Sequence, residues 1–487
     1  MDLYCKSIAA VTAIMLCCTA GTASAWTGEW NNSGGKRKNV TADTCAVTAG
    51  RKKKDTGNLP FEDRELKARA FFKDGKFNVA TGDGKFRIWL DNRIYTDASF
   101  YIPTESVDGL TSKINKDLEE DDGAFRFSNG VSIRRARFAI KAELYERWFA
   151  EFDLDFAYNE VEIKDMYLGY RFNEHLSLQA GHFKEPMSIE RVTSSRYISA
   201  NERPMPVEAL AGGRRLGIAA TWWGKYWWVS GGIFGQQVDI IQKERNRGSD
   251  GFGFTGRVAV PVINNGNMTL HIGGYASWRR PDAGGETDRT VLFRTFPESR
   301  TDRRRFLQAE VGNVSSYTTY GAEVAFRWSK FLAYGEYLFT DLRRYRYDED
   351  VRNPLKNAEF AGWYATASWM ILGQQRHYSP EDAEFGGVKV DRKGGNLELS
   401  ARVSHLNLND FHDMSSPVTG GMAYSYSANL NWYPVSNVLV GLNYLFMDND
   451  KYADSKGQIT AGNRPLSEAR PGGIDFHVLQ LRLMVSF

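Results

Sequence analysis

The C-terminal stretch Leu479-Gln480-Leu481-Arg482-Leu483-Met484-Val485-Ser486-Phe487 (residues 479–487) decides the fold. Its odd-numbered positions are all apolar, and Gln480, Arg482 and Ser486 stand between them. Because successive side chains of an extended strand point to opposite faces, this alternation predicts a β-strand with one apolar face and one largely polar face.

The same period of two recurs upstream to about residue 84. It is clear in residues 131–144, 148–156 and 424–432, where apolar side chains alternate with charged or polar ones. Counting such segments predicts sixteen strands and an all-β protein. The expected strands are residues 84–101, 129–144, 148–158, 160–172, 175–184, 214–223, 226–236, 251–262, 267–279, 316–328, 330–345, 358–372, 395–408, 420–433, 437–448 and 474–487.

The lengths of the connections distinguish a membrane barrel from a soluble sandwich, which would also show alternation. Turns such as 146–147, 224–225 and 434–437 are short, and polar connections such as 184–213, 280–315 and 449–473 are long. Short turns on one rim and long loops on the other are typical of outer-membrane barrels. We therefore predict a transmembrane antiparallel β-barrel over residues 84–487, with short periplasmic turns and long extracellular loops, in the bacterial outer membrane.

Hydropathy excludes a helical membrane protein. Mean hydropathy is −0.45, and no run after residue 25 approaches the roughly 20 apolar residues that a spanning helix needs. Aromatic residues cluster beside the expected short turns, as in Trp222, Trp223, Tyr226, Trp227 and Trp228. Rings with one polar edge favour the lipid–water boundary, so these clusters are expected to form an aromatic belt.

The N-terminus is expected to direct secretion. Lys6, an apolar stretch and a terminal Ala23-Ser24-Ala25 form a signal peptide over residues 1–25, which leaves Cys45 as the one remaining cysteine. Residues 26–68 are polar and basic, and we expect a periplasmic N-terminal segment over residues 26–83. Its basic runs are either solvated or a tether to acidic cell-wall polymers.

Several motifs resemble the phosphate-selective porin O/P family. They include Ile133-Arg134-Arg135-Ala136-Arg137-Phe138, the run from Lys164 to Tyr170, the run from Ala180 to Pro186 and the run from Leu430 to Pro434, in family order between about residues 70 and 487. The resemblance implies a homotrimer that passes phosphate or other small anions. It places pore-lining roles on Arg134, Arg135, Asp155, Arg203 and, loosely, Arg294. Arg137 departs from the pattern, because the family has an aromatic residue there.

The placement of arginine supports an anion pathway independently. By parity Arg135, Arg137 and Lys141 face the lumen, since their neighbours are apolar and a lipid-facing Arg costs about 2–4 kcal/mol at mid-depth. The 280–305 loop is also rich in arginine, and we name Arg294, Arg303, Arg304 and Arg305 as candidate anion-binding residues. The alternative is a solvated surface loop. Asp153 and Asp155 are expected to neutralise nearby cations, and the alternative is that they tune the affinity so that anions leave.

No catalytic residue, metal site or cofactor is predicted. The seven histidines are scattered, and no glycine-rich phosphate loop is present. The expected partners are outer-membrane lipid, lipopolysaccharide and small anions, with no nucleic acid. The sequence thus favours a passive, anion-preferring channel that is not an enzyme. A barrel that mainly binds ligands or partners, and an outer-membrane hydrolase, remain as alternatives.

Overall fold

The computed structural model describes residues 67–73, 75–105, 127–235, 237, 251–283, 289–348, 351–414, 417–453, 460–461 and 473–487. The expected signal peptide, the basic stretch up to residue 66 and Cys45 lie outside these residues. None of the helices in the described part is long and apolar enough to cross a bilayer.

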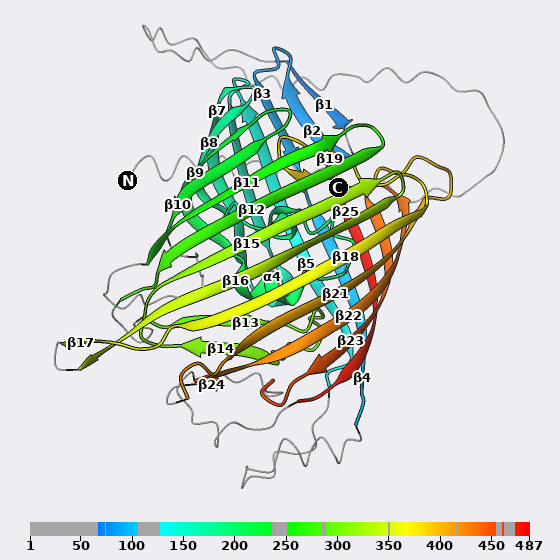
Figure 1. Ribbon diagram of the computed structural model, residues 1–487. Coiled ribbons are helices and arrows are strands. Elements are labelled where there is room, and N and C mark those ends of the chain that lie inside the picture. The colour runs from blue at the N-terminus through cyan, green and yellow to red at the C-terminus, as the bar shows by residue number, and fades with distance from the viewer. Residues whose placement is uncertain are drawn as a thin grey trace, which may run out of the picture. The chain divides into compact units, whose positions relative to one another are not determined.

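A closed antiparallel barrel of sixteen strands dominates the described residues (Figure 1). Its first and last strands pair along their whole length, from Arg93↔Ser486 to Pro103↔Phe476. Closure is required in lipid, because an open edge would leave backbone N–H and C=O groups without partners. The strands are β4 (Arg93–Pro103), β5 (Gly130–Leu144), β6 (Trp148–Asp155), β7 (Glu162–Asn173), β8 (Leu176–Lys184), β9 (Arg214–Trp223), β10 (Trp228–Phe234), β11 (Phe252–Asn264), β12 (Met268–Arg280), β15 (Val314–Trp328), β16 (Phe331–Asp348), β18 (Ala358–Leu372), β21 (Asn396–Asp410), β22 (Val418–Val435), β23 (Val438–Asn449) and β25 (Phe476–Ser486).

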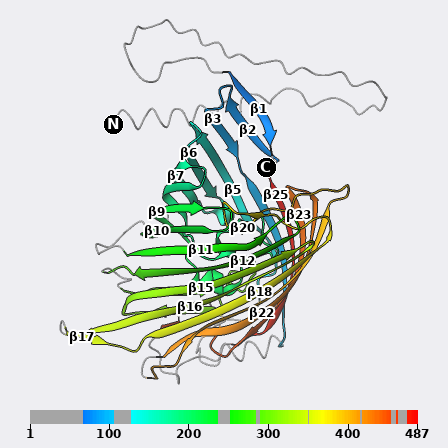
Figure 2. The same cartoon turned by 45° about the horizontal axis from the view of Figure 1, so that its top comes forward.

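These strands confirm the sixteen segments expected from the sequence, with one interruption. The first expected strand, 84–101, is divided at Asp91 and Asn92 into β3 (Phe86–Leu90) and β4. Both pieces pair with β5. Ahead of them, β1 (Ala68–Lys73) and β2 (Lys76–Thr81) form a hairpin on β3, which extends the sheet into the stretch expected to be a periplasmic segment (Figure 2).

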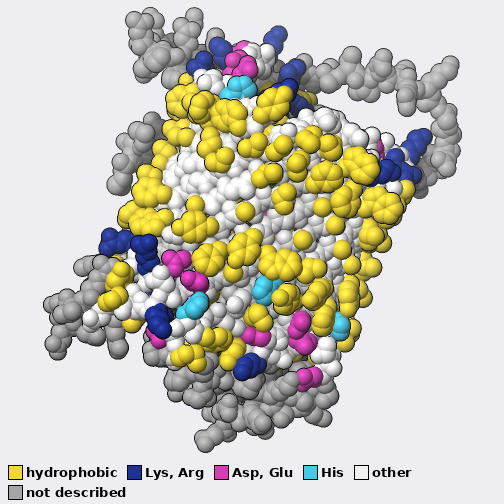
Figure 3. Space-filling view, in the orientation of Figure 1, with side chains coloured by type: hydrophobic (Ala, Val, Ile, Leu, Met, Phe, Trp, Pro, Cys, Tyr) yellow, Lys and Arg dark blue, Asp and Glu magenta, His cyan; other side chains and the backbone are white. Residues whose placement is uncertain are grey.

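The two faces of the wall have the expected characters. Leu479, Leu481 and Leu483 on β25 are 48%, 51% and 49% exposed, whereas Gln480 and Arg482 between them are 0% and 3% exposed. The outer face seen in Figure 3 is largely apolar, and charged side chains gather toward its two ends. The apolar side chains therefore face lipid and the polar ones face the interior of the barrel.

The aromatic clusters divide between the two faces. Trp222, Tyr226 and Trp227 lie on the exposed side of the short turn between β9 and β10, as expected for a belt. Trp223 and Trp228, which were expected to join them, are buried and point into the barrel. The correction follows from the period of two, which sends adjacent rings of a strand to opposite faces.

Two connections on the long-loop rim fold into the barrel. The 185–213 connection carries α3 (Ile189–Val192) and α4 (Met205–Leu210), and the 281–313 connection carries β13 (Val291–Thr295) and β14 (Leu307–Val311). Their apolar side chains form one core with the inner face of β16 to β25. This core includes Met205, Val207, Leu210, Phe293, Phe306 and Leu307 from the connections, and Leu338, Phe360, Leu406, Leu445 and Phe476 from the wall.

Shorter elements complete the described structure. A 3-10 turn, η1 (Ala157–Asn159), follows β6, and β17 (Val351–Pro354) extends β16 beyond the rim. β24 (Thr460–Ala461) pairs with β14. On the short-turn rim, one connection is unexpectedly long: residues 373–395 carry β19 (Tyr378–Ser379) and β20 (Glu384–Phe385).

Placing an arginine on the lipid face tests this assignment of faces. Leu481 lies opposite Leu442 and Ala98, in the middle of two strand pairs, and the variant is Leu481→Arg. We expect it to lower the free energy of unfolding in lipid vesicles by about 2–4 kcal/mol. Glu174→Arg, in an exposed short turn, is the control and should change that free energy by less than about 0.5 kcal/mol. Equal effects of the two variants would contradict the assignment.

Candidate functional site

A β-bulge in β5 turns two successive arginines into the barrel. Tyr95 of β4 pairs with Arg135, but the next residue, Thr96, pairs with Ile133, so Arg134 has no opposite partner in the register. Arg134 and Arg135 are both buried as a result. Strict alternation would have sent Arg134 to the lipid face, and the bulge removes that conflict.

Arg134 is held by the inward 185–213 connection. Its Nε donates to Glu202 Oε1 at 2.5 Å and its Nη2 donates to Oε2 at 2.7 Å. Arg482 of β25 also reaches Glu202 Oε1, at 3.0 Å. The paired geometry fixes the connection across the lumen. Coulombic attraction and donation from Arg134, with Arg300 and Arg482, hold the pKa of Glu202 well below its usual range despite its burial.

Arg135 is bound differently from Arg134. It forms no ion pair among the described residues, and its guanidinium lies 5.7 Å from the centre of the Tyr95 ring. Arg134 and Arg137 flank it on the same strand. A guanidinium held on an aromatic face keeps its charge and most of its donors for a ligand.

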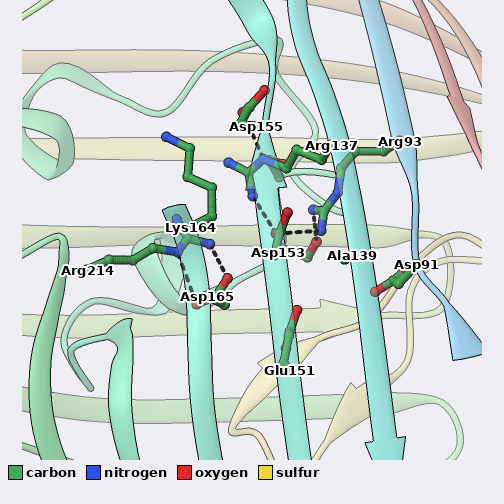
Figure 4. A network of polar contacts seen from close by, with 12 residues as sticks. Asp91, Arg93, Arg137, Ala139, Glu151, Asp153, Asp155, Lys164, Asp165 and Arg214 are labelled. Atoms are coloured by element: carbon green, nitrogen blue, oxygen red, sulfur yellow. Dashed lines mark hydrogen bonds and ion pairs between the residues drawn. The ribbon is translucent and has the colours of Figure 1, made fainter. Parts of the chain in front are cut away.

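Arg137 lies in a row of alternating charges on the inner wall (Figure 4). Its Nε donates to Asp155 Oδ2 at 3.0 Å and its Nη1 to Asp153 Oδ2 at 3.3 Å. Arg93 is 3.5 Å from the same Asp153 oxygen. The two aspartates thus neutralise neighbouring cations, as expected from the sequence.

Two further cations line this part of the wall. Arg214 donates to both oxygens of Asp165, at 3.0 and 2.7 Å. Lys141 Nζ lies 3.3 Å from Asp91 Oδ2 and 3.1 Å from Glu151 Oε2, closer to the short-turn rim. Lys141 therefore faces the interior as predicted, but with both of its carboxylate partners in place.

Glu151, Asp153 and Asp165 come close enough together to suggest a metal site. Each of them is engaged by a cationic side chain, because Lys141 contacts Glu151, Arg93 and Arg137 contact Asp153, and Arg214 contacts Asp165. A divalent cation would meet these like charges at short range, so the cluster favours salt bridges over metal binding.

The 281–313 connection brings the predicted loop arginines into the barrel. Arg303 lies 4.4 Å from the centre of the Tyr158 ring, and Arg305 lies 4.2 Å from that of Phe296. Arg294 on β13 is exposed to the interior space. None of these three forms an ion pair among the described residues. Arg304 is placed apart, 3.4 Å from Asp302.

Repulsion among these arginines lowers a guanidinium pKa, and their attraction lowers the pKa of a nearby carboxyl. Burial, together with the charges of Arg294, Arg300 and Arg303, lowers the pKa of Arg305 to about 10. Burial opposes ionisation of Glu208, yet Arg191 and Arg300 lower its pKa to about 2. Both groups are charged at neutral pH, so the local excess of positive charge is retained.

These side chains surround a cavity of about 680 Å³, which we call the arginine chamber. Its lining includes eleven lysines and arginines but four aspartates and glutamates. Five of the guanidinium groups have no carboxylate partner among the described residues. They are Arg135, Arg203, Arg294, Arg303 and Arg305.

Arg203 is the most constrained of the five. Its Nε donates to Glu190 O at 2.9 Å and its Nη2 donates to Thr193 O at 2.7 Å. These bonds tie the two halves of the 185–213 connection together. Arg203 therefore shapes the chamber and also contributes charge to it.

The arginine chamber lies between two other cavities that share part of its lining. Toward the long loops, a cavity of about 440 Å³ shares Arg191, Glu208, Arg294, Arg300 and Arg305 with it. Toward the short turns, a cavity of about 510 Å³, which we call the exit chamber, shares Arg137, Arg203 and Arg214. The three cavities thus follow one another along the barrel and share arginines in their linings.

The sequence predicted most of the basic residues that line the chamber, but it did not predict Lys164 and Arg191. Lys164 has the parity of a lipid-facing residue and reaches the chamber because of a register shift between β6 and β7. Arg191 lies in α3, and only the inward fold of its connection places it there. The family motif containing Lys164 was the one available signal.

Comparisons with known proteins agree with this architecture. The model of the family described as phosphate-selective porin O and P matches residues 113–487. Porin O of Pseudomonas aeruginosa is 24% identical over 413 residues, which cover 79% of this chain and 88% of that protein. An uncharacterized protein of Caulobacter vibrioides is 25% identical over 329 residues, 66% of this chain, and the match spans 63% of that protein's own length.

Solved outer-membrane proteins are similar to this chain at low identity. The anion-selective porin from Comamonas acidovorans is 12% identical, with a TM-score of 0.47 over 82% of this chain and 100% of that chain. OmpT of Vibrio cholerae, in its trimer form, is 9% identical, with a TM-score of 0.46 over 82% of this chain and 99% of that chain. With its family model matched over most of its length, the chain belongs to the phosphate-selective porin O and P family and is a porin of the bacterial outer membrane.

Proposed function

We propose that this porin is a passive channel that prefers anions, phosphate or other small oxyanions among them. The observation that carries the proposal is the arginine chamber, in which eleven lysines and arginines face four carboxylates. Field lines concentrate in a cleft with low-dielectric walls, so this excess raises the local concentration of anions. Rings of basic side chains select anions in the same way in other pores.

The arginines that lack a carboxylate partner are the ones that can bind an anion as it passes through the channel. Arg135, Arg303 and Arg305 have no carboxylate to displace, so their N–H groups replace water around an oxyanion directly. Arg134, Arg137 and Arg214 are fixed by carboxylates and hold the wall in position. An anion meets several separate donors in place of one closed cage, which keeps binding reversible.

The partner molecules proposed here are those that the outer membrane supplies. The apolar outer wall takes lipid, and lipopolysaccharide is the expected partner of the long loops. We also propose a homotrimer, as the family resemblance implies. No step in the proposed function requires a cofactor or a chemical reaction.

Reversing the charge of Arg135 tests the anion preference. Arg135→Glu should lower the chloride-to-potassium permeability ratio by roughly thirtyfold, because it changes the charge by two units and each unit charge a few ångströms from an ion in water contributes about 1 kcal/mol. The measurement is the reversal potential of purified channels in a planar bilayer under a KCl gradient. Arg343→Glu, exposed on the outer side of β16, is the matched control and should leave the ratio unchanged. A wild-type channel that prefers potassium would refute the proposal, and a protein without conductance would favour the binding scaffold.

Phosphate block of the chloride current tests the loop arginines. Arg303→Gln combined with Arg305→Gln should weaken the apparent affinity for phosphate about tenfold, because each change removes a charge-assisted donor. The measurement is single-channel current in KCl as phosphate is added at fixed pH. Arg304→Gln removes the same charge from a residue outside the chamber and should weaken block by less than about twofold. If phosphate blocks the double variant as strongly as the wild type, the loop does not bind the anion.

A further inference from the structure

The long connection on the short-turn rim enters the barrel and is anchored there. Residues 373–395, which we call the turn hairpin, join β18 to β21. Tyr378 Oη lies 2.8 Å from His271 Nδ1, and Arg257 Nη2 donates to Ala383 O at 2.8 Å. Trp228 Nε1 donates to Glu381 O, also at 2.8 Å. Three wall residues thus hold the tip of the hairpin, which makes it a fixed part of the lumen.

The tip carries three carboxylates into the exit chamber. Glu381, Asp382 and Glu384 all line that cavity. None of the three forms an ion pair among the described residues, and Asp382 accepts a hydrogen bond from the hydroxyl of Ser379 at 2.7 Å. The tip of the hairpin therefore contributes negative charge to the exit chamber.

The ten described cations of the exit chamber are held by other groups, and none of them forms an ion pair with the hairpin carboxylates. Arg257 is paired with Glu323 at 2.8 Å. Lys184 Nζ donates to the backbone oxygens of Val192 and Thr193 at 2.6 and 3.2 Å, and Arg203 is likewise bound to carbonyl groups. The others contact carboxylates, namely Lys76, Arg93, Arg137, Lys141, Arg171, Arg196 and Arg214.

We propose that the turn hairpin determines selectivity at the exit of this channel, by opposing anions through the free carboxylates of Glu381, Asp382 and Glu384. An anion that leaves the arginine chamber passes Arg137, Arg203 and Arg214 and then meets these like charges. Their repulsion weakens its binding at the shared residues and limits the anion preference of the whole channel. The proposal rests on the anion channel proposed above.

The charge of the hairpin also changes near neutral pH. Burial and repulsion from Asp382 raise the pKa of Glu384 to about 7, against the opposing charges of Lys184 on β8, Arg257 on β11 and Arg203 on the inward connection. A carboxyl with a raised pKa is protonated below that pH and charged above it. The exit chamber thus loses negative charge as the pH falls.

Neutral replacements test the proposal. The triple variant E381Q, D382N and E384Q should raise the chloride-to-potassium permeability ratio at pH 8.5 at least about twofold, because it removes repulsive charges from the route. The single variant E384Q should show part of that increase and serves if the triple variant inserts poorly. Asp391→Asn is the matched control, since Asp391 lies exposed on the same connection and outside the exit chamber. It should leave the ratio unchanged.

A pH comparison in KCl provides a second readout. Between pH 8.5 and pH 5.5 the wild-type ratio should rise, and it should rise less in E384Q, whose side chain cannot titrate. An anion-preferring wild type with an unchanged ratio in the triple variant overturns this inference and leaves the proposed function intact. A wild type without anion preference overturns both.

Discussion

Pairing of every backbone polar group in lipid is the constraint on which the rest of this structure depends. The wall meets it by closing β25 onto β4 over eleven residue pairs, so the first and last strands of the barrel have no open edge toward each other. Closure forces each strand to present one face to lipid and one to the interior. Arginines, aspartates and glutamates, which are unfavourable in lipid, are thereby concentrated inside the barrel and contact one another there.

This concentration would be unstable without compensation, and the inward connections supply it. Glu323 and Glu336 on the wall accept hydrogen bonds from the backbone amides of Ile189 and Glu190 at 2.8 and 3.1 Å. On the other side of the lumen, Glu202 of the same connection neutralises Arg134. Buried charges are tolerated when they are paired and hydrogen-bonded. The 185–213 connection is therefore held in place by charged side chains that face the interior of the barrel.

The charged groups that lack an ion-pair partner differ along the length of the lumen. The inward connections fill the side of the barrel near β16 to β25 with an apolar core, including Leu338 and Phe306, and leave the route along the β5 side. In the arginine chamber the groups without opposite partners are guanidiniums. In the exit chamber Lys184 and Arg203 have only carbonyl partners among the described residues, and the carboxylates without an ion pair are those of the turn hairpin. A single lumen thus has two electrostatic environments, separated by Arg137, Arg203 and Arg214.

The sequence by itself determined the barrel, because a period of two can be recognised from residues alone. It located all sixteen strands, the inward faces of Arg135, Arg137 and Lys141, and the pairing role of Asp155. The tertiary structure decided where that period is broken. The β5 bulge turns Arg134 inward, Lys164 follows a register shift, and Arg304 stays apart from Arg303 and Arg305. Only three-dimensional packing places the turn hairpin against His271 and Arg257, since those contacts join residues more than a hundred positions apart, beyond the reach of any local pattern.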